Sequence, residues 1–291
     1  AFIKEREKEK TIPGPFGDVV HLDIRHLGRK KIDKKLPFVR ELAKNYAGID
    51  PVYEPIPVRP VVHYMMGGID TNIDCSTILP GLFAAGECAC VSINGANRLG
   101  SNSLTEILVY GARAGNAAAV FAAEHSEINL EALEKQGADE YKRITRDFLQ
   151  KDGGSERIAS LRKEMHQVME HSVDIFRSES GLKEACNKIE ELKDRFSSIL
   201  IEDKSLIFNT ELTSALELEN MIDVAESIIF SALSRRESRG SHQRTDFANR
   251  DDENFLRHSL AYRTEAESRI EYQDVVITKW PPAERIYGKE E

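Results

Sequence analysis

The sequence predicts a mixed α and β fold, with short strands and glycine-rich loops over the first 124 residues and an antiparallel helical bundle after them. Two observations predict it. Apolar runs broken by glycines, at 58–69 and 80–88, are typical of short buried strands. From residue 125 onward, apolar residues recur at alternating steps of three and four, which is the period of amphipathic helices that pack as a bundle.

The composition describes an acidic chain with room for about two ordinary domains. It has 291 residues, 31% of them charged, and a net charge of -9. Such a charge gives no general affinity for nucleic acid or anionic membranes. The alanine-rich run at 117–123 is far shorter than a membrane span, so we expect no direct membrane insertion. The four cysteines form no C-x-x-C pair, so no metal site or iron–sulfur cluster is predicted.

The first part of the chain predicts a small helical and strand-containing unit. The charged stretch 4–10 is typical of a solvated helix end. Apolar residues at 19–24 predict a strand, and those at 36–46 fall at helical spacing. Prolines within 50–57 mark a boundary with the next part.

The runs that we expect to form strands end in glycine turns. The run 58–69 ends in the Gly67–Gly68 turn, and the run 80–88 breaks at Gly86 and ends on Glu87. A carboxylate in that place is suited to pairing with the vicinal hydroxyls of ribose or ribitol.

The stretch 95–106 carries the densest local signals. Glycines, amides, hydroxyls and one arginine crowd there with almost no bulky apolar side chain, so we expect a ligand rather than packing to shape it. Ser103 and Glu106 have the spacing of a capping box, which predicts a helix that starts near Ser103. Its first-turn amides and positive dipole end would make an anion site at the loop. Gly111 and Gly115 lie on one face of this helix, where a neighbouring backbone could approach closely.

Four apolar stripes at helical spacing predict the bundle. We expect a turn at 151–155 between helices, Gly240 to stop the last helix, and extended segments at 260–262 and 269–277. The stripes are Leu130, Leu133, Tyr141, Ile144 and Phe148; Ile158, Leu161, Met165, Val168, Ser172 and Phe176; Leu182, Ala185, Ile189, Leu192, Phe196 and Ile199; and Leu212, Leu216, Ile222, Ala225, Ile229 and Leu233.

Several of these motifs together resemble the flavoprotein subunits of fumarate reductase and succinate dehydrogenase, most closely the quinol:fumarate reductase type. They occur in the family's order, so the resemblance covers essentially the whole chain. The chain lacks G-x-G-x-x-G and does not begin with methionine, so we expect a C-terminal portion of a longer polypeptide. The matching stretches are DVVHLDIRHLG at 18–28, HYMMGG at 63–68, GLFAAGE at 81–87, GANRLGSNSL at 95–104, RESRGSHQR at 236–244 and RDDENFL at 250–256.

The resemblance implies an α+β or α/β fold class with a division into four parts. Residues 1–56 would be the remnant of a capping domain, and 57–124 the C-terminal part of a Rossmann-like FAD-binding domain. Residues 125–240 would form the antiparallel helical bundle domain, and 241–291 a short extended C-terminal segment. The strand and turn that grip the FAD phosphates, the site of covalent flavin attachment and the proton-donating arginine would lie outside this chain.

The resemblance also implies the site residues. Arginines in general more often pair with surface carboxylates, but here the motif favours Arg98 as the ligand of a substrate carboxylate, which its planar fork can hold at two points. His63 would bind substrate as well, although outside the motif it is simply a hydrogen-bonded histidine at a strand end. The N-terminus of the helix at Ser103 would stabilise negative charge on reduced flavin. The expected FAD contacts are His63, Tyr64, Glu87, Arg98, Leu99, Gly100, Ser101, Asn102, Ser103 and Leu104.

The function that the resemblance implies is reduction of fumarate to succinate by hydride transfer from FAD. Electrons would come from quinol through an iron–sulfur subunit, in a complex held by membrane anchor subunits at the cytoplasmic face of the inner membrane. Ser101 and Cys88 favour this branch over succinate dehydrogenase, which often has alanine at the Ser101 position and would run the reverse reaction. L-aspartate oxidase shares the Gly-Ala-Asn-Arg loop and is a third interpretation.

Another class of function is also open. The chain by itself could be a non-catalytic docking module whose helical bundle binds a partner. The resemblance implies that the arginines of the 235–244 region lie towards the iron–sulfur subunit and the substrate site, where they could serve docking. Otherwise they are simply cations near the C-terminus of a helix.

Overall fold

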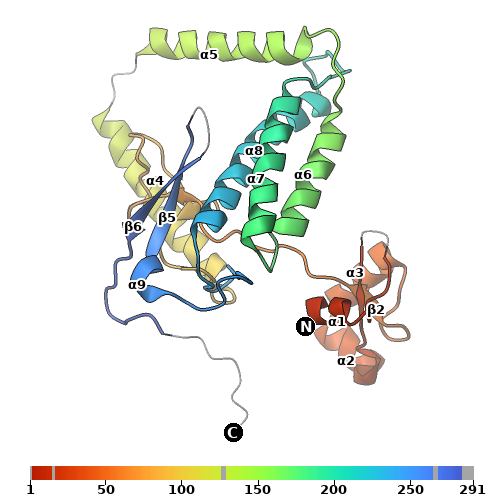
Figure 1. The fold of residues 1–291 in the computed structure, drawn as a ribbon. Helices are drawn as coiled ribbons and strands as arrows, with labels where there is room; N and C mark the ends of the chain where they lie inside the picture. Colours follow the sequence, from red (N-terminus) through yellow and green to blue (C-terminus); the bar gives the residue numbers. More distant parts are fainter. Residues whose placement is uncertain (1, 15–16, 126–128, 265–267, 284–291) are drawn as a thin grey trace. The chain divides into compact units, whose positions relative to one another are not determined.

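The computed structural model describes residues 2–14, 17–125, 129–264 and 268–283 (Figure 1). They fall into two compact units, Ala1–Met65 and Met66–Glu291. Helices and strands occur in both, so the mixed α and β class expected from the sequence is confirmed. Among the described residues, every helix is too short or too polar to cross a lipid bilayer.

The first unit packs short helices against a two-stranded antiparallel sheet, in which Val20 pairs with Val58. The helix and the strand expected at 36–46 and 19–24 are both present, and the charged first helix has no buried residue. Proline opens α3 because its fixed φ suits a first helical turn, and Gly48 ends it at a φ of 67°. The elements are α1 (Phe2–Glu7), β1 (Val20–Leu22), the 3-10 turn η1 (Arg25–Leu27), α2 (Gly28–Lys35), α3 (Pro37–Ala47) and β2 (Ile56–Val58).

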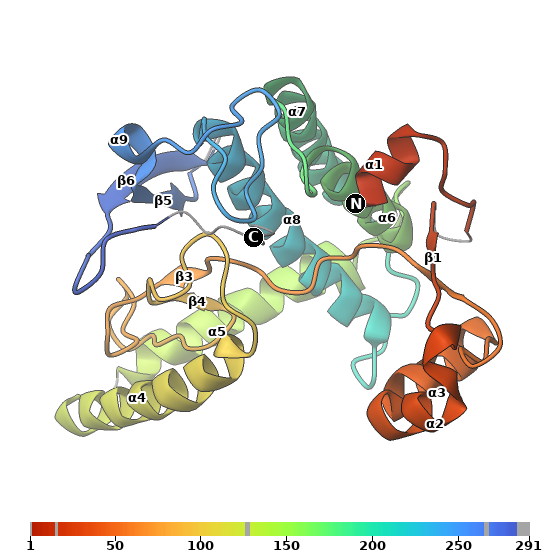
Figure 2. The same cartoon turned by 90° about the horizontal axis from the view of Figure 1, so that it is seen from below.

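The second unit begins with irregular chain that leads into a long helix. A two-residue parallel pair, β3 (Ile69–Asp70) and β4 (Ala89–Cys90), precedes α4 (Asn102–Glu124). Gly68 allows this pairing, because a Cβ there would lie 2.5 Å from the Cys88 carbonyl oxygen. Figure 2 shows β3 and β4 beside α4 within this unit.

The strands expected at 58–69 and 80–88 are wrong in their extent. The first ends at Val58, and residues 59–68 form no regular element. The second shrinks to Ala89–Cys90, beyond the predicted run. The physical reason is the glycines, because Gly67, Gly68 and Gly86 have φ values of 113°, 130° and 86°, which no strand accommodates.

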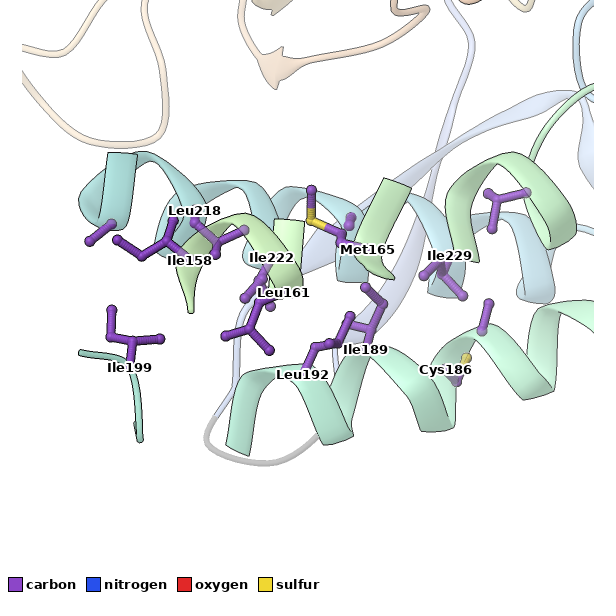
Figure 3. Packing of buried hydrophobic residues seen from close by; sticks show 14 of the residues in the cluster. Ile158, Leu161, Met165, Cys186, Ile189, Leu192, Ile199, Leu218, Ile222 and Ile229 are labelled. Carbon is purple, nitrogen blue, oxygen red and sulfur yellow. The ribbon is translucent and has the colours of Figure 1, made fainter. Parts of the chain in front are cut away.

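The bundle consists of α6 (Ile158–Ser172), α7 (Glu179–Phe196) and α8 (Thr210–Ser234). Side-chain oxygens cap two of these helices: Ser178 accepts from the Gly181 amide at 3.2 Å, and Asn209 accepts from the Leu212 amide at 2.7 Å. Their apolar stripes meet in one buried cluster, as predicted (Figure 3). Its fully buried members include Leu161, Leu182, Ile189, Leu192, Leu218 and Ile229.

The remaining stripe does not join the bundle as expected. Helix α5 (Leu130–Ile144) has no buried residue, and Leu130, Leu133 and Tyr141 are 66%, 54% and 58% exposed. The bundle core is already filled by three helices, so α5 meets it only at its C-terminal end. There Ile144 packs against the core cluster, and the π-helical turn Thr145–Leu149 inserts its phenylalanine into it.

Two single-residue expectations for the bundle are also wrong. Helix α6 ends at Ser172, so Phe176 lies beyond it and is 49% exposed. Helix α8 ends at Ser234, six residues before Gly240, whose φ of 59° serves a tight turn instead. Local spacing carries no information about this turn, because the contact that requires glycine there comes from another part of the chain.

The chain closes with α9 (Asp252–Phe255) and an antiparallel hairpin of β5 (Arg257–Tyr262) and β6 (Arg269–Asp274). This confirms the two extended segments, although the second stops at Asp274. The hairpin lies against the end of α8 (Figure 2), where the Tyr272 hydroxyl donates to the Ser234 carbonyl at 3.1 Å.

Truncation of a leucine in the bundle core should cost far more stability than the same change on α5. Leu218 is fully buried, whereas Leu133 is 54% exposed. We expect Leu218→Ala to lower the free energy of unfolding by about 2–5 kcal/mol because it leaves a cavity. Leu133→Ala should lower it by less than about 0.5 kcal/mol. Urea denaturation followed by circular dichroism measures both, and equal losses would contradict a core that leaves Leu133 of α5 outside.

Candidate functional site

Arg98 lies in the loop that joins β4 to α4. This loop, residues 91–101, contains three residues with left-handed backbone conformation, Ser92 at a φ of 69°, Gly95 at 57° and Ser101 at 63°. Arg98 is partly buried, and its Nη1 donates to the carbonyl of Leu99 at 3.2 Å. The sequence therefore sets a guanidinium directly before the N-terminal, positive end of a helix of 23 residues.

The start of α4 differs from the predicted capping box. The helix begins at Asn102, its N-cap is Ser101, and no side chain caps it. Ser103 is inside the first turn, so its expected exchange of hydrogen bonds with Glu106 is wrong. No side chain caps the first turn, and two of its amides donate to the backbone: the Asn102 amide to the Leu99 carbonyl at 3.2 Å and the Leu104 amide to the Ser101 carbonyl at 3.1 Å.

Glu106 has a different function from the predicted one. It is buried, at 2% exposure, and its carboxylate accepts from Asn94 Nδ2 at 2.7 Å. Asn94 Oδ1 in turn accepts from Asn102 Nδ2 at 3.2 Å. Glu106 thus ties the loop to the helix. Sequence reasoning missed Asn94, because a spacing of twelve residues matches no local motif.

The turn that ends at Glu87 packs against α4 through its glycine. Gly86, immediately before it, has a φ of 86°, and a Cβ there would come 3.0 Å from Ile107 on α4. The close approach requires glycine and brings the 81–87 turn against the helix. The Glu87 side chain is exposed, whereas Gly86 is buried.

The predicted site residues are divided between the two units. Glu87 and the run Arg98, Leu99, Gly100, Ser101, Asn102, Ser103 and Leu104 belong to the second unit, where the run spans the end of the loop and the first residues of α4. His63, which is exposed, and Tyr64, which is half-buried, belong to the first unit. The joint action of His63 and Arg98 on one substrate stays a prediction.

Comparison with known proteins gives the same assignment to both ends of the chain. Residues 162–287 match the family model described as fumarate reductase flavoprotein C-term, and residues 1–104 match that of an FAD binding domain. The fumarate reductase flavoprotein subunit of Mycobacterium tuberculosis is 54% identical over 99% of this chain and 50% of that protein.

More distant and structural relatives agree. The succinate dehydrogenase flavoprotein subunit of Rickettsia bellii is 38% identical over 94% of this chain and 48% of its own length. A solved structure of a mutant Escherichia coli quinol fumarate reductase, 48% identical, superposes with a TM-score of 0.93 and covers 100% of this chain and 50% of that one. The chain belongs to the fumarate reductase and succinate dehydrogenase flavoprotein family. It spans about half the length of the relatives that it matches.

The residues around α4 fit the FAD that this family's domain binds. At Gly95 and Gly100 a Cβ would meet nothing within 4 Å, so the backbone is open to a ligand. The N-terminus of α4 and the Arg98 guanidinium favour negatively charged oxygens, and the exposed Glu87 carboxylate accepts from hydroxyls. This combination of donors and acceptor matches a flavin and its ribityl or ribose hydroxyls.

A second element of this flavoprotein chain, the segment 235–252 that follows α8, lies against the Arg98 loop. Its buried centre is Glu237, whose carboxylate accepts from Arg235 at 2.6 Å, from Arg239 at 2.8 Å and from the Asp251 amide at 2.8 Å. Burial alone would raise the pKa of Glu237, but the hydrogen bonds of Arg239, the Asp251 amide and Arg235 outweigh it and hold the pKa below its ordinary value.

Arg244, one of the arginines of the 235–244 region, interacts with the C-terminus of α8. Its side chain is fully buried and donates to the carbonyls of Ala232 and Leu233 at 3.1 and 3.2 Å, in the last turn of α8. Two further bonds of 2.8 Å bind Asp246. The interpretation of this residue as a cation at a helix C-terminus is confirmed, whereas docking by the cluster stays a prediction.

His242 is buried within the same segment as a neutral imidazole. Its Nδ1 accepts from Arg177 Nη1 at 2.8 Å, and its Nε2 donates to the Arg235 carbonyl at 3.0 Å, so the proton is on Nε2. Burial lowers the pKa of His242 to about 4, and the positive charge of Arg177 acts in the same direction. Sequence reasoning did not single out this histidine, because its environment is made by tertiary contacts.

Protonation of His242 should destabilise the fold at acid pH. The pKa is about 4 in the folded protein against 6.5 ordinarily, so the unfolded chain takes up the proton first. The stabilisation is complete above about pH 6.5 and is lost as the pH falls towards 4, by about 3 kcal/mol in total. Urea midpoints measured from pH 7.5 to pH 4 follow this loss.

Two matched variants identify the group. His242→Gln keeps one donor and one acceptor but cannot be protonated, so its stability should fall less steeply with acid. His166→Gln, which removes an exposed histidine of α6, should retain the slope of the unmodified protein. An unchanged slope in His242→Gln would assign the pH dependence to another group.

Proposed function

We propose that this chain is the C-terminal half of the flavoprotein subunit of a fumarate reductase. The observation that carries the proposal is the placement of Arg98 directly before the N-terminus of α4, in a loop shaped by left-handed residues and tied to the helix by Glu106. The 54% identical relative named as a fumarate reductase flavoprotein subunit supports the same reaction.

In this proposal Arg98 and His63 bind the two carboxylates of fumarate. A guanidinium offers two parallel N–H donors to one carboxylate, which fixes its plane as well as its position. An imidazole N–H binds the other end and so sets the orientation of the carbon–carbon double bond. Fixed orientation and stabilised negative charge are the contributions of these residues to the rate.

The residues around α4 would hold FAD, which supplies the hydride for the double bond when it is bound. Tyr64, Glu87 and the run from Arg98 to Leu104 are its proposed contacts, several of them through backbone amides. The positive end of α4 would stabilise negative charge on the group bound beside it.

We also propose the division into domains and the assembly that the family resemblance implies. Residues 1–56 complete a capping domain, 57–124 a Rossmann-like FAD-binding domain, 125–240 an antiparallel helical bundle domain, and 241–291 an extended segment. An iron–sulfur subunit would pass electrons from quinol, with membrane anchor subunits holding the complex peripherally at the cytoplasmic face of the inner membrane. The solved quinol fumarate reductase of similar structure supports quinol as the electron source.

Arg98→Lys should reduce fumarate turnover strongly while the flavin is retained. Lysine keeps the charge but cannot form the bidentate hydrogen bonds of a guanidinium with a carboxylate. We therefore expect kcat/KM for fumarate to fall about 100-fold. Steady-state assays of the full-length flavoprotein with a reduced dye as electron donor measure this. Arg146→Lys alters an exposed arginine paired with Asp147 and is the matched control, expected to have no effect. Wild-type kinetics in Arg98→Lys would refute substrate binding by this residue.

The direction of the reaction has its own test. We expect the full-length flavoprotein to reduce fumarate faster than it oxidises succinate with artificial dyes, because relatives named as fumarate reductases are 54% identical and the succinate dehydrogenase 38%. The opposite ratio would favour succinate dehydrogenase. A colourless and inactive preparation that still binds an iron–sulfur subunit would favour the docking function instead.

A further inference from the structure

We propose that Ser241 and Gly240 position Arg98 by fixing the carbonyl of Ala96, two residues before it. This positioning depends on the proposed function of Arg98 in binding substrate. Both the Ser241 amide and the Ser241 hydroxyl donate to the Ala96 carbonyl oxygen, at 2.9 and 2.7 Å. The segment after α8 thus holds the loop before α4 across 145 residues of sequence.

Gly240 makes this contact possible. A Cβ on it would lie 2.6 Å from the Ala96 carbonyl oxygen and 2.8 Å from the Ala96 Cβ, closer than side chains tolerate. Its φ of 59° is also the left-handed conformation that glycine adopts without strain. The two backbones therefore approach each other at a point where only glycine fits.

The Arg98 loop has further anchors along its length. Ser92 Oγ lies 2.8 Å from His258 Nε2 on β5, and Asn94 is bonded to Glu106. Of these three anchored positions before Arg98, Ala96 is the nearest in sequence; after Arg98, the Leu99 carbonyl accepts from the Asn102 amide at 3.2 Å. Loss of this anchor releases the part of the loop that sets the direction of the guanidinium.

The turn that contains Ser241 is held in place by its own backbone hydrogen bonds and by buried side chains next to it. The Arg239 amide donates to the His242 carbonyl at 2.8 Å, and the His242 amide donates back to the Arg239 carbonyl at 3.0 Å. The His242 ring and the Glu237 carboxylate, both buried, hold the two sides of this turn. A rigid support of this kind is what a loop needs to present a side chain in one geometry.

A displaced Arg98 would bind a carboxylate less well even though the arginine is present. Two-point contact with a carboxylate depends on angle as well as distance, and misplacement by about 1 Å can cost about 100-fold in rate. Ser241 does not touch substrate in this proposal. It acts through Arg98, so its removal should weaken substrate binding without loss of flavin.

Ser241→Ala in the full-length flavoprotein tests the proposal. We expect the KM for fumarate to rise about five- to tenfold, as for the loss of one hydrogen bond of about 1 kcal/mol, with flavin content and melting temperature unchanged. Ser241→Thr keeps the hydroxyl and should restore the KM. Ser197→Ala is the control, since it also deletes a hydroxyl bond of 2.7 Å to a carbonyl, at the end of α7.

The outcomes separate this proposal from the function of Arg98. A KM in Ser241→Ala equal to that of Ser197→Ala overturns the positioning function. Loss of flavin or of thermal stability in Ser241→Ala overturns it too, because the bond would then serve the fold. If Arg98→Lys leaves kcat/KM for fumarate unchanged, the proposed function itself fails.

A double variant gives a second readout. In the Arg98→Lys background, Ser241→Ala should add less than about twofold to the KM, because both changes damage one interaction. Full multiplication of the two effects would overturn the proposal. Gly240→Ala should raise the KM at least as much as Ser241→Ala, since its methyl group displaces Ala96.

Discussion

The buried ionic cluster at the end of α8 is the constraint on which the geometry around the site depends. Glu237 has no exposed side-chain surface, and the Arg244 side chain has none either. A buried charge left unpaired is very costly, so the arginines, carboxylates and carbonyls of this segment must hold one arrangement. That arrangement fixes the turn that contains Ser241, which in turn binds the loop of Arg98. Stability at the end of the bundle and order at the site are therefore linked.

The same contacts connect the helical bundle of this chain to the Arg98 loop. The bundle core is apolar and contains the stripes of α6, α7 and α8, so it supplies a stable base for the chain that leaves α8. The Arg98 loop has few apolar side chains of its own and cannot fold around a core. It gains order from polar contacts with α4, with the 235–252 segment and with His258.

Sequence reasoning succeeded where the physical signal is local or where motifs identify the family. The stripes of α6, α7 and α8 are periodic because one face of each helix is buried, and this periodicity is visible without a structure. The start of α4 was predicted to within one residue. The capping box was predicted because Ser103 and Glu106 have the right spacing. The prediction is wrong because the Glu106 carboxylate binds Asn94 instead.

The other errors share one cause. The stripe of α5 has helical spacing, but spacing does not say whether a face finds a partner, and Leu130 and Leu133 remain exposed. Gly67, Gly68 and Gly86 lie in runs that are apolar enough for strands, but their left-handed backbone ends regular pairing. In each case the residue pattern belongs to one segment, whereas burial or strand pairing depends on a second segment that packs against it.

The sequence by itself determined the family, the mixed α and β class, the bundle helices and the residues expected to bind FAD and substrate, because motifs and periodicities are properties of neighbouring residues. Only the tertiary structure decided which helix stays outside the core, that Glu106 binds Asn94, and that Gly240 meets Ala96. These contacts join residues 12 to 144 positions apart. The order of residues along the chain does not indicate which distant groups approach each other after folding.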